Sequence, residues 1–214
     1  MPAKIKFCGM MQPADAALAA DTGAAYLGVV FAGGPRAVTS ERARAVVRAA
    51  GGVPVFGVFG EQSPEEILQI AGQVGLSGAQ LHGAYSGDDA SRLRAAGLQV
   101  WRVVRIAVPS DLDLLAEASA ESEAVLVEPR VSHARGGAGV PLDLAVAREA
   151  RARLAGHPMA LAGGLTAENV LQALDVVRPE IVDVSSGVEQ QPGVKDTQKM
   201  ARFVEAVFAH TPVS

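Results

Sequence analysis

The sequence predicts a single-domain (β/α)8 barrel, the TIM-barrel class, over residues 1–214. Eight short apolar runs recur roughly 25 residues apart, and segments with helical periodicity separate them. Short connections join each run to the segment that follows it. Alternating strands and helices of this kind form βα units with right-handed crossovers, and eight such units close into a barrel.

The predicted strands are short and rich in Val, Ile, Leu and Ala. Because they alternate only weakly between apolar and polar residues, they are typical of strands buried on both faces. In chain order the eight runs lie at 4–9, 25–31, 53–60, 78–83, 99–106, 124–129, 158–164 and 181–187. The chemistry of such a barrel lies at the C-terminal strand ends, so the residues that end these runs are candidates for a site.

The clearest predicted helix covers residues 63–75. Ser63 is the expected N-cap, Pro64 takes the first helical position, and Glu66 completes a capping box. The same reasoning predicts helices at 39–52, 166–177 and 196–210.

An open doubly wound sheet is the main alternative, since it uses the same alternation of strands and helices. The first apolar run is not followed by GxGxxG, which favours the barrel. No linker rich in Pro or Ser and no low-complexity tract divides the chain. We therefore expect one domain.

Composition argues against several kinds of partner. The net charge is −4, with 49% hydrophobic residues, so no overall basic field attracts nucleic acid. The N-terminal residues lack the apolar stretch of a signal peptide, and no run approaches the roughly 18 apolar residues that span a bilayer. Cys8 is the one cysteine, which fits a reducing compartment. We expect a cytoplasmic protein without nucleic-acid or membrane partners, and a monomer, with a dimer as the alternative.

The seventh and eighth runs each end in a glycine-containing loop that leads toward a helix, "LAGGLTAENV" and "VDVSSGVEQQPGVKD". Glycine lets backbone N–H groups approach phosphate oxygens, and a helix N-terminus adds partial positive charge. The pattern predicts a phosphate site, whereas the alternative is that the glycines only form tight turns. The residues concerned are Gly163, Gly164, Ser185, Ser186 and Gly187.

Candidate acids and bases end the first, sixth and eighth runs. Cys8 is a base or nucleophile if a cation lowers the pKa of its thiol, and Lys6 lies on the same face of a regular strand. The alternative is an inert buried thiol. Glu128 and Asp183 are each a candidate general acid if burial raises the carboxyl pKa. Asp183 is also a candidate substrate binder or structural anchor, which must be hydrogen-bonded in its apolar strand.

Three more polar residues follow strand ends. Arg36 offers a planar fork for a carboxylate or phosphate, although a solvated loop arginine is the alternative. Gln80 and His82 end the fourth run, where they orient a substrate or simply fill the core. No second histidine lies at ligand spacing, so we expect no metal site.

Eight short motifs occur in an order that resembles the phosphoribosylanthranilate isomerase family. They are "KFCGM", "GPRAV", "GVF", "AQLHG", "GGAG", "LAGGLTAENV", "DVSSGVE" and "PGVKD". The match runs from the first strand to the last helix, and the combination of "CG" with "DVSSGVE" and "PGVKD" is highly specific.

The resemblance implies a cofactor-free Amadori rearrangement of a phosphorylated small molecule, N-(5-phosphoribosyl)anthranilate. It implies that Cys8 is the general base, that Glu128 occupies the place of the general acid, and that Arg36 binds the anthranilate carboxylate. Asp183 is expected near the ribose hydroxyls, with Gln80 and His82 as further substrate contacts. The expected phosphate ligands are the five loop residues named above together with Gly137 and Gly139 of "GGAG".

The chain departs from the family pattern in the loop before Arg36, which reads "AGG" where a serine often precedes the proline, and at four further positions. Glu128 stands where aspartate is usual, and Pro129 restricts it to extended backbone. The other departures are Met10, Met11 and Ala138. They leave two alternatives open, a related isomerase of another phosphosugar and a non-catalytic barrel that binds a phospholigand.

Overall fold

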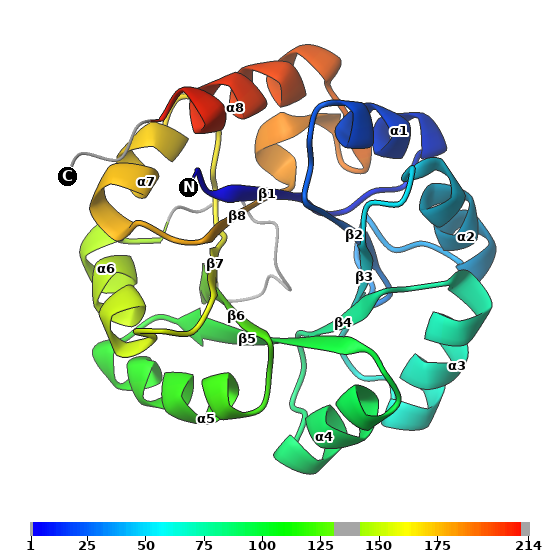
Figure 1. Cartoon of the computed structure of the whole chain (residues 1–214), viewed down its shortest axis with the longest axis horizontal. Helices are drawn as coiled ribbons and strands as arrows, with labels where there is room; N and C mark the ends of the chain where they lie inside the picture. The colour runs from blue at the N-terminus through cyan, green and yellow to red at the C-terminus, as the bar shows by residue number, and fades with distance from the viewer. Residues whose placement is uncertain (1, 131–141, 211–214) are drawn as a thin grey trace.

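The computed structural model describes residues 2–130 and 142–210, and its strands close into a barrel (Figure 1). Eight parallel strands pair in chain order, and β1 pairs with β8, with Lys6 opposite Asp183. This closure confirms the barrel and is the feature that an open sheet lacks. The strands are β1 Lys4–Phe7, β2 Tyr26–Val30, β3 Val55–Phe59, β4 Gly78–Leu81, β5 Gln99–Ile106, β6 Ala124–Pro129, β7 Met159–Leu161 and β8 Ile181–Val184.

Eight α-helices surround the barrel as an outer ring (Figure 1). They are α1 Pro13–Asp21, α2 Ser40–Ala49, α3 Pro64–Val74, α4 Gly87–Ala95, α5 Leu114–Ala120, α6 Leu144–Arg153, α7 Val170–Val177 and α8 Thr197–Ala209. Short additions are the 3-10 turns Pro109–Asp113 and Ser186–Val188 and a hairpin of β9 Glu189–Gln191 and β10 Val194–Lys195. Within the described residues, each helix is too short or too polar to cross a membrane.

The predicted helix starts are confirmed for α3 but not for α7. Ser63 caps α3, and Glu66 completes the capping box, as the sequence predicts. The α-helical part of α7 begins only at Val170, because residues 166–169 form a turn first. In that turn the Thr166 amide donates to the side chain of Asn169 at 2.8 Å. The loop after β7 is therefore longer than the sequence predicts.

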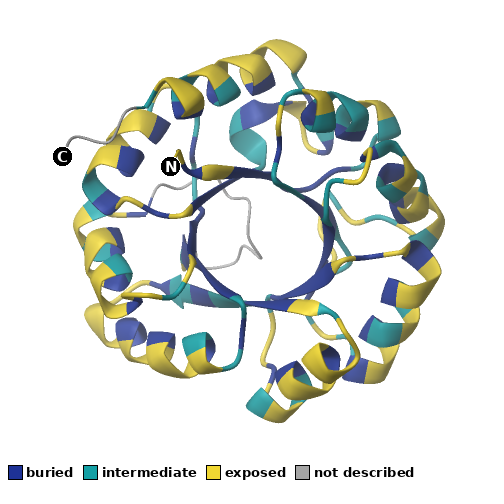
Figure 2. Cartoon of the chain, in the orientation of Figure 1, coloured by how far each residue is buried: buried dark blue, intermediate teal, exposed yellow. Residues whose placement is uncertain are grey.

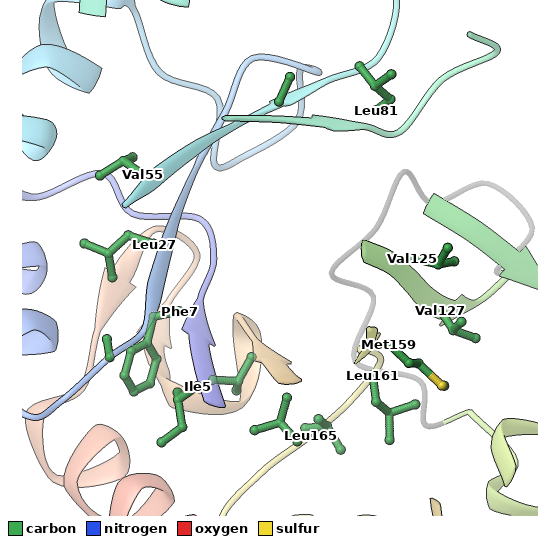
Figure 3. Packing of buried hydrophobic residues seen from close by; sticks show 14 of the residues in the cluster. Ile5, Phe7, Leu27, Val55, Leu81, Val125, Val127, Met159, Leu161 and Leu165 are labelled. Carbon is green, nitrogen blue, oxygen red and sulfur yellow. The ribbon is translucent and has the colours of Figure 1, made fainter. Parts of the chain in front are cut away.

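The main core lies between the barrel and its helices. Figure 2 shows the strands largely buried, and helices that are buried toward the barrel and exposed on the outside. Because successive strand residues point to opposite faces, Ile5 and Phe7 of β1 pack outward against the helix layer (Figure 3). Lys6, between them, therefore points into the barrel.

A second, smaller core fills the barrel interior toward the N-terminal ends of the strands. Phe56 and Trp101 lie 4.7 Å apart between ring centroids, and Tyr26 stands edge-on to both. Leu126 and Ile181 belong to the same buried cluster. Polar side chains inside the barrel lie beyond these rings, toward the C-terminal strand ends. The apolar filling thus supports a polar site at one mouth of the barrel.

Two glycines give a matched test of this packing. A Cβ on Gly78 in β4 would lie 2.3 Å from a Phe56 ring carbon and 2.6 Å from the Gln99 carbonyl oxygen. We expect Gly78→Ala to lower the free energy of unfolding by about 1–3 kcal/mol because the interior cannot expand. Gly72 is exposed in α3 with open space around it, so Gly72→Ala should raise that free energy by about 0.5–1 kcal/mol. Urea unfolding measures both, and equal effects would contradict the packing argument.

Candidate active site

The C-terminal strand ends enclose one polar pocket. Seven of the residues predicted from the sequence line it: Cys8, Arg36, Gln80, His82, Glu128, Asp183 and Ser185. Gln80, Glu128 and Asp183 lie in β4, β6 and β8, and the other four directly follow β1, β4 or β8 or lie in the loop after β2. Parallel strands all end on the same side, which is why residues so distant in sequence meet here.

A buried lysine links three strands inside the barrel. Lys6 of β1 donates to Asp183 of β8 at 2.5 Å and to Gln80 of β4 at 2.9 Å. Its side chain is fully buried, and that of Asp183 is 9% exposed. Burial lowers the pKa of Lys6, but the carboxylate of Asp183 and the nearby thiol of Cys8 together raise it, so the ammonium stays charged. The expected hydrogen bond of Asp183 is thus present.

The Cys8 thiol faces the same lysine. A Cβ on Gly28 of β2 would lie 2.8 Å from Cys8 Sγ and 3.3 Å from Lys6 Nζ, so both groups approach this glycine. Burial raises the pKa of the thiol, and the charges of Lys6 and Lys195 only partly oppose this. In the free protein Cys8 is therefore mainly a protonated thiol at neutral pH.

Glu128 is held by two neighbours. His82 Nε2 lies 2.9 Å and Arg105 Nε 3.0 Å from the same Glu128 oxygen, Oε1. Arg105 and Glu128 are opposite each other in the register of β5 and β6, and Glu128 lies in extended backbone, as Pro129 requires. Arg105 also contacts the His82 ring and donates to the His82 carbonyl at 3.2 Å.

The pKa of Glu128 differs from the sequence-based expectation. Burial raises it, but the hydrogen bonds and charges of His82 and Arg105 outweigh burial and hold the pKa below its usual value. The condition that burial raises the pKa of this carboxyl is therefore not met in the free protein. Glu128 is a carboxylate at neutral pH.

Arg36 is engaged by a carboxylate of the chain itself. Its Nε and Nη2 donate to Glu189 at 2.9 and 2.7 Å. Glu189, at the start of β9, also pairs with Lys195 of β10 at 2.9 Å. Arg36 is therefore an ordered part of the pocket wall and not a solvated loop residue.

The two predicted phosphate loops lie against each other. A Cβ on Gly187 would be 1.9 Å from the Leu165 carbonyl oxygen, so the backbones after β7 and β8 touch. Gly163 and Gly164 have φ of +106° and +60°, which only glycine adopts readily. Of the five predicted loop residues, Ser185 lines the pocket, whereas Gly163 lines a separate hollow with Leu165 and Asn169. Ser186 begins the short turn that includes Gly187. Gly137 and Gly139 lie outside the described residues.

A larger hollow opens at the opposite, N-terminal end of the barrel, with Tyr26 and Trp101 in its wall. Its carboxylates serve the fold, because Glu123 accepts from Arg94 and the Val100 amide, and Glu180 accepts from Arg151 and the Met159 amide. Among residues 2–130 and 142–210 no three His, Cys, Asp or Glu side chains gather as metal ligands would. The chemistry-bearing groups are therefore concentrated at the C-terminal mouth.

Sequence reasoning did not assign site roles to Arg105, Glu189 and Lys195. Arg105 lies in the fifth predicted strand, Glu189 in "DVSSGVE" and Lys195 in "PGVKD", but the sequence does not show which residue each of them contacts. Arg36 and Glu189, for example, are 153 residues apart. The signal in the sequence was the presence of charged residues in otherwise apolar strands or glycine-rich loops, which need a partner when buried.

Replacing Lys6 tests the buried ion pair. Lys6→Met leaves the Asp183 carboxylate buried without its cation, so we expect unfolding free energy to fall by about 3–5 kcal/mol. The double variant Lys6→Met/Asp183→Asn removes the stranded charge and should recover part of that loss. Urea unfolding of both variants measures the difference, and equal stability of the single and double variants would argue against the pair.

Comparison with known proteins points to one family. A family model described as N-(5'phosphoribosyl)anthranilate (PRA) isomerase matches residues 5–206. The N-(5'-phosphoribosyl)anthranilate isomerase of Rubrobacter xylanophilus is 39% identical over 207 residues, covering 95% of this chain and 98% of the relative.

Solved structures agree with the sequence comparison. Phosphoribosyl anthranilate isomerase from Thermotoga maritima superposes with a TM-score of 0.87 at 31% identity, covering 97% of this chain and 100% of that chain. A phosphoribosyl anthranilate isomerase in complex with reduced 1-(o-carboxyphenylamino)-1-deoxyribulose 5-phosphate superposes with a TM-score of 0.84 at 30% identity. Its alignment covers 97% of this chain and 100% of that chain.

Proposed function

The chain belongs to the N-(5'-phosphoribosyl)anthranilate isomerase family, and on that premise we propose how it acts as an isomerase of tryptophan biosynthesis. The substrate is N-(5-phosphoribosyl)anthranilate, and the product is 1-(2-carboxyphenylamino)-1-deoxyribulose 5-phosphate. The rearrangement converts an aldose derivative into a ketose derivative on the same carbon skeleton, without a cofactor.

Glu128 and Cys8 carry the two proton transfers. Protonated Glu128 gives its proton to the furanose ring oxygen, so the bond between C1 and that oxygen breaks and a protonated imine forms. The Cys8 thiolate then removes the proton from C2, and the electron pair of that C–H bond moves to give the enolamine, which tautomerises to the ketone. Cys8 directly follows β1 and Glu128 lies in β6, and these two strands do not pair, so the groups reach the sugar from different sides of the mouth.

Two anchors hold the substrate between these groups. Arg36 meets the anthranilate carboxylate, and the adjoining loops after β7 and β8 meet the phosphate through backbone amides and the hydroxyls of Ser185 and Ser186. Gln80 and Asp183 border the space for the ribose, and Lys6 holds both in place. Fixing both ends of a flexible substrate presents its reacting carbons to the acid and the base.

The observation that carries the proposal is the convergence of seven predicted site residues on one pocket. The test is to mix purified protein with freshly prepared substrate and follow the loss of its fluorescence. Turnover, together with growth rescue of a tryptophan auxotroph that lacks this step, supports the proposal. Binding without turnover at high protein concentration would instead favour a non-catalytic phospholigand-binding barrel.

The protonation states of the free protein predict a particular pH dependence. The reactive form needs a Cys8 thiolate and a Glu128 carboxylic acid, whereas the free protein mainly holds the opposite pair. The population of the reactive form is then constant between the two pKa values. It falls below the pKa of Glu128 as the thiolate disappears, and above the pKa of Cys8 as the acid disappears.

Arg105→Met should shift the acid side of this profile. Removing the guanidinium takes away one of the two partners that lower the pKa of Glu128, so that pKa rises. The acid midpoint of kcat/KM therefore moves to higher pH, while the alkaline midpoint, set by Cys8, stays in place. Arg102→Met, which opens a pair with Glu121 outside the pocket, is the matched control. An acid midpoint that is unchanged or lower in Arg105→Met would contradict the assignment.

Two further points stay predictions. We propose that residues 1–214 form one domain, which a single cooperative unfolding transition would support. We also propose a monomer, with a dimer as the alternative, and sedimentation equilibrium distinguishes the two.

A further inference from the structure

One buried ammonium joins three parts of the pocket. Lys195 Nζ donates to the Cys8 carbonyl at 2.6 Å, to the Ser185 carbonyl at 3.2 Å and to Glu189 Oε1 at 2.9 Å. Its side chain has no exposed surface. The end of β1, the loop after β8 and the β9–β10 hairpin are therefore tied to the same atom.

Glu189, which accepts from Lys195, also accepts hydrogen bonds from Arg36. The Arg36 Nε lies 2.9 and 3.1 Å from the two Glu189 oxygens, and Nη2 lies 2.7 Å from Oε2. Two of the five guanidinium N–H groups thus serve Glu189, and the remaining ones are free for an anion. The stem of Arg36 lies close against Gly9, where a Cβ would stand 2.6 Å from Arg36 Cδ. Arg36 can present its remaining donors in essentially one direction.

The charges of this cluster do not cancel. Arg36 and Lys195 bring two positive charges, and Glu189 brings one negative charge. Burial lowers the pKa of Lys195, with Glu189 opposing this, and the hydrogen bond with Glu189 raises the pKa of Arg36. The cluster therefore carries a net charge of +1, which is located at the outer edge of Arg36. A carboxylate of a ligand bound there would neutralise it.

We propose that Glu189 and Lys195 are positioning residues that set the direction of Arg36 relative to Cys8 for the reaction. The inference rests on the proposed function, because it takes the ligand of Arg36 to be the anthranilate carboxylate. It assigns that carboxylate to the outer Nη1 and Nη2 donors, since the Nε edge is occupied by Glu189. The Lys195 ammonium then fixes the positions of three groups relative to one another. They are Arg36, which binds the substrate carboxylate, the base Cys8 and the loop after β8.

Glu189→Gln tests the first link, because it keeps the size of the side chain but removes its charge. A displacement of about 1 Å in a positioned site costs roughly 100-fold, so we expect kcat/KM to fall by about 10- to 100-fold. The loss should appear in kcat as well as KM, since the reacting carbon moves away from Cys8. Glu121→Gln breaks an ion pair of 2.6 Å with Arg102 outside the pocket and should leave kcat/KM within about twofold.

A double-mutant cycle separates positioning from a merely structural role. If Glu189 acts through Arg36, adding Glu189→Gln to an Arg36→Met background should change kcat/KM by less than about twofold. The full loss of the single variant, repeated in that background, would overturn the proposal. Lys195→Met should also lower kcat/KM, and the part of this loss that acts through Glu189 should disappear in the Arg36→Met background. A further part should remain there, because Lys195 also binds the Cys8 carbonyl.

Binding distinguishes this inference from the proposed function. The same cycle is measured by calorimetric titration with reduced 1-(o-carboxyphenylamino)-1-deoxyribulose 5-phosphate, which needs no turnover. Coupled loss of affinity in a protein without turnover would support the positioning role and contradict the proposed activity. Additive losses in an active protein would contradict the positioning role alone, and a wild type that fails to bind this compound would overturn both.

Discussion

Cys8→Ala is expected to lower kcat by about 100- to 10,000-fold, the range in which a positioned general base contributes. The thiol lines the pocket, and the charges of Lys6 and Lys195 both favour its thiolate, although burial outweighs them in the free protein. Alanine removes the proposed proton acceptor and leaves both proposed anchors of the substrate in place. KM should therefore change by a few-fold at most.

Cys8→Ser separates the chemistry of sulfur from its size. A hydroxyl fills nearly the same space but ionises far less readily than a thiol, so we expect its kcat to stay close to that of Cys8→Ala. Thermal unfolding of both variants checks that the barrel is intact. A Cys8→Ala protein whose kcat stays within tenfold of the wild type would remove Cys8 from the mechanism, although it would leave the activity itself in place.

The positions of the acid–base candidates were predictable from the sequence because of a property of parallel barrels. Cys8 and Glu128 are 120 residues apart in the chain, yet each ends a buried strand, and all strand ends of one kind gather at one mouth. Residue type and place in the strand order were sufficient for this step. No knowledge of side-chain contacts was needed.

Side-chain partners were not predictable in the same way. Whether Arg105 meets Glu128 depends on the register of β5 against β6, which the sequence pattern leaves undetermined. The condition that burial raises the pKa of Glu128 is not met in the free protein, because His82 and Arg105 supply two opposing contacts. The late start of α7 has a similar cause, since Asn169 binds the Thr166 amide within the chain's own turn.

The glutamate side chain at position 128 is longer than the aspartate usual in the family, and the extra methylene lets its carboxylate reach His82 and Arg105. Its Oε1 receives both His82 Nε2 and Arg105 Nε at about 3 Å. Aspartate at this position would draw the carboxylate back by one methylene, a step of about 1.5 Å along the chain. Both contacts would then lengthen beyond ordinary hydrogen-bond distance.

Glu128→Gln is expected to lower kcat by about 100- to 10,000-fold, because the amide keeps the shape of the side chain but has no acidic proton to give to the ring oxygen. The pH profile of kcat/KM should change its form as well as its height. In the proposed mechanism the rate of the wild type should fall on the alkaline side because the carboxylic acid is lost, and that fall should disappear in the variant. The residual rate should instead rise with pH until it levels off above the raised pKa of Cys8.

Glu128→Asp is the matched control, because it keeps an acidic proton on a shorter stem. It should retain a two-sided profile with a kcat between those of the wild type and Glu128→Gln. Its acid midpoint should move to higher pH, since the contacts that lower the carboxyl pKa are weakened. An unchanged two-sided profile in Glu128→Gln would show that another group donates the proton. His82 would then be the next residue to replace, because its ring nitrogen lies 2.9 Å from the same carboxylate in the same pocket.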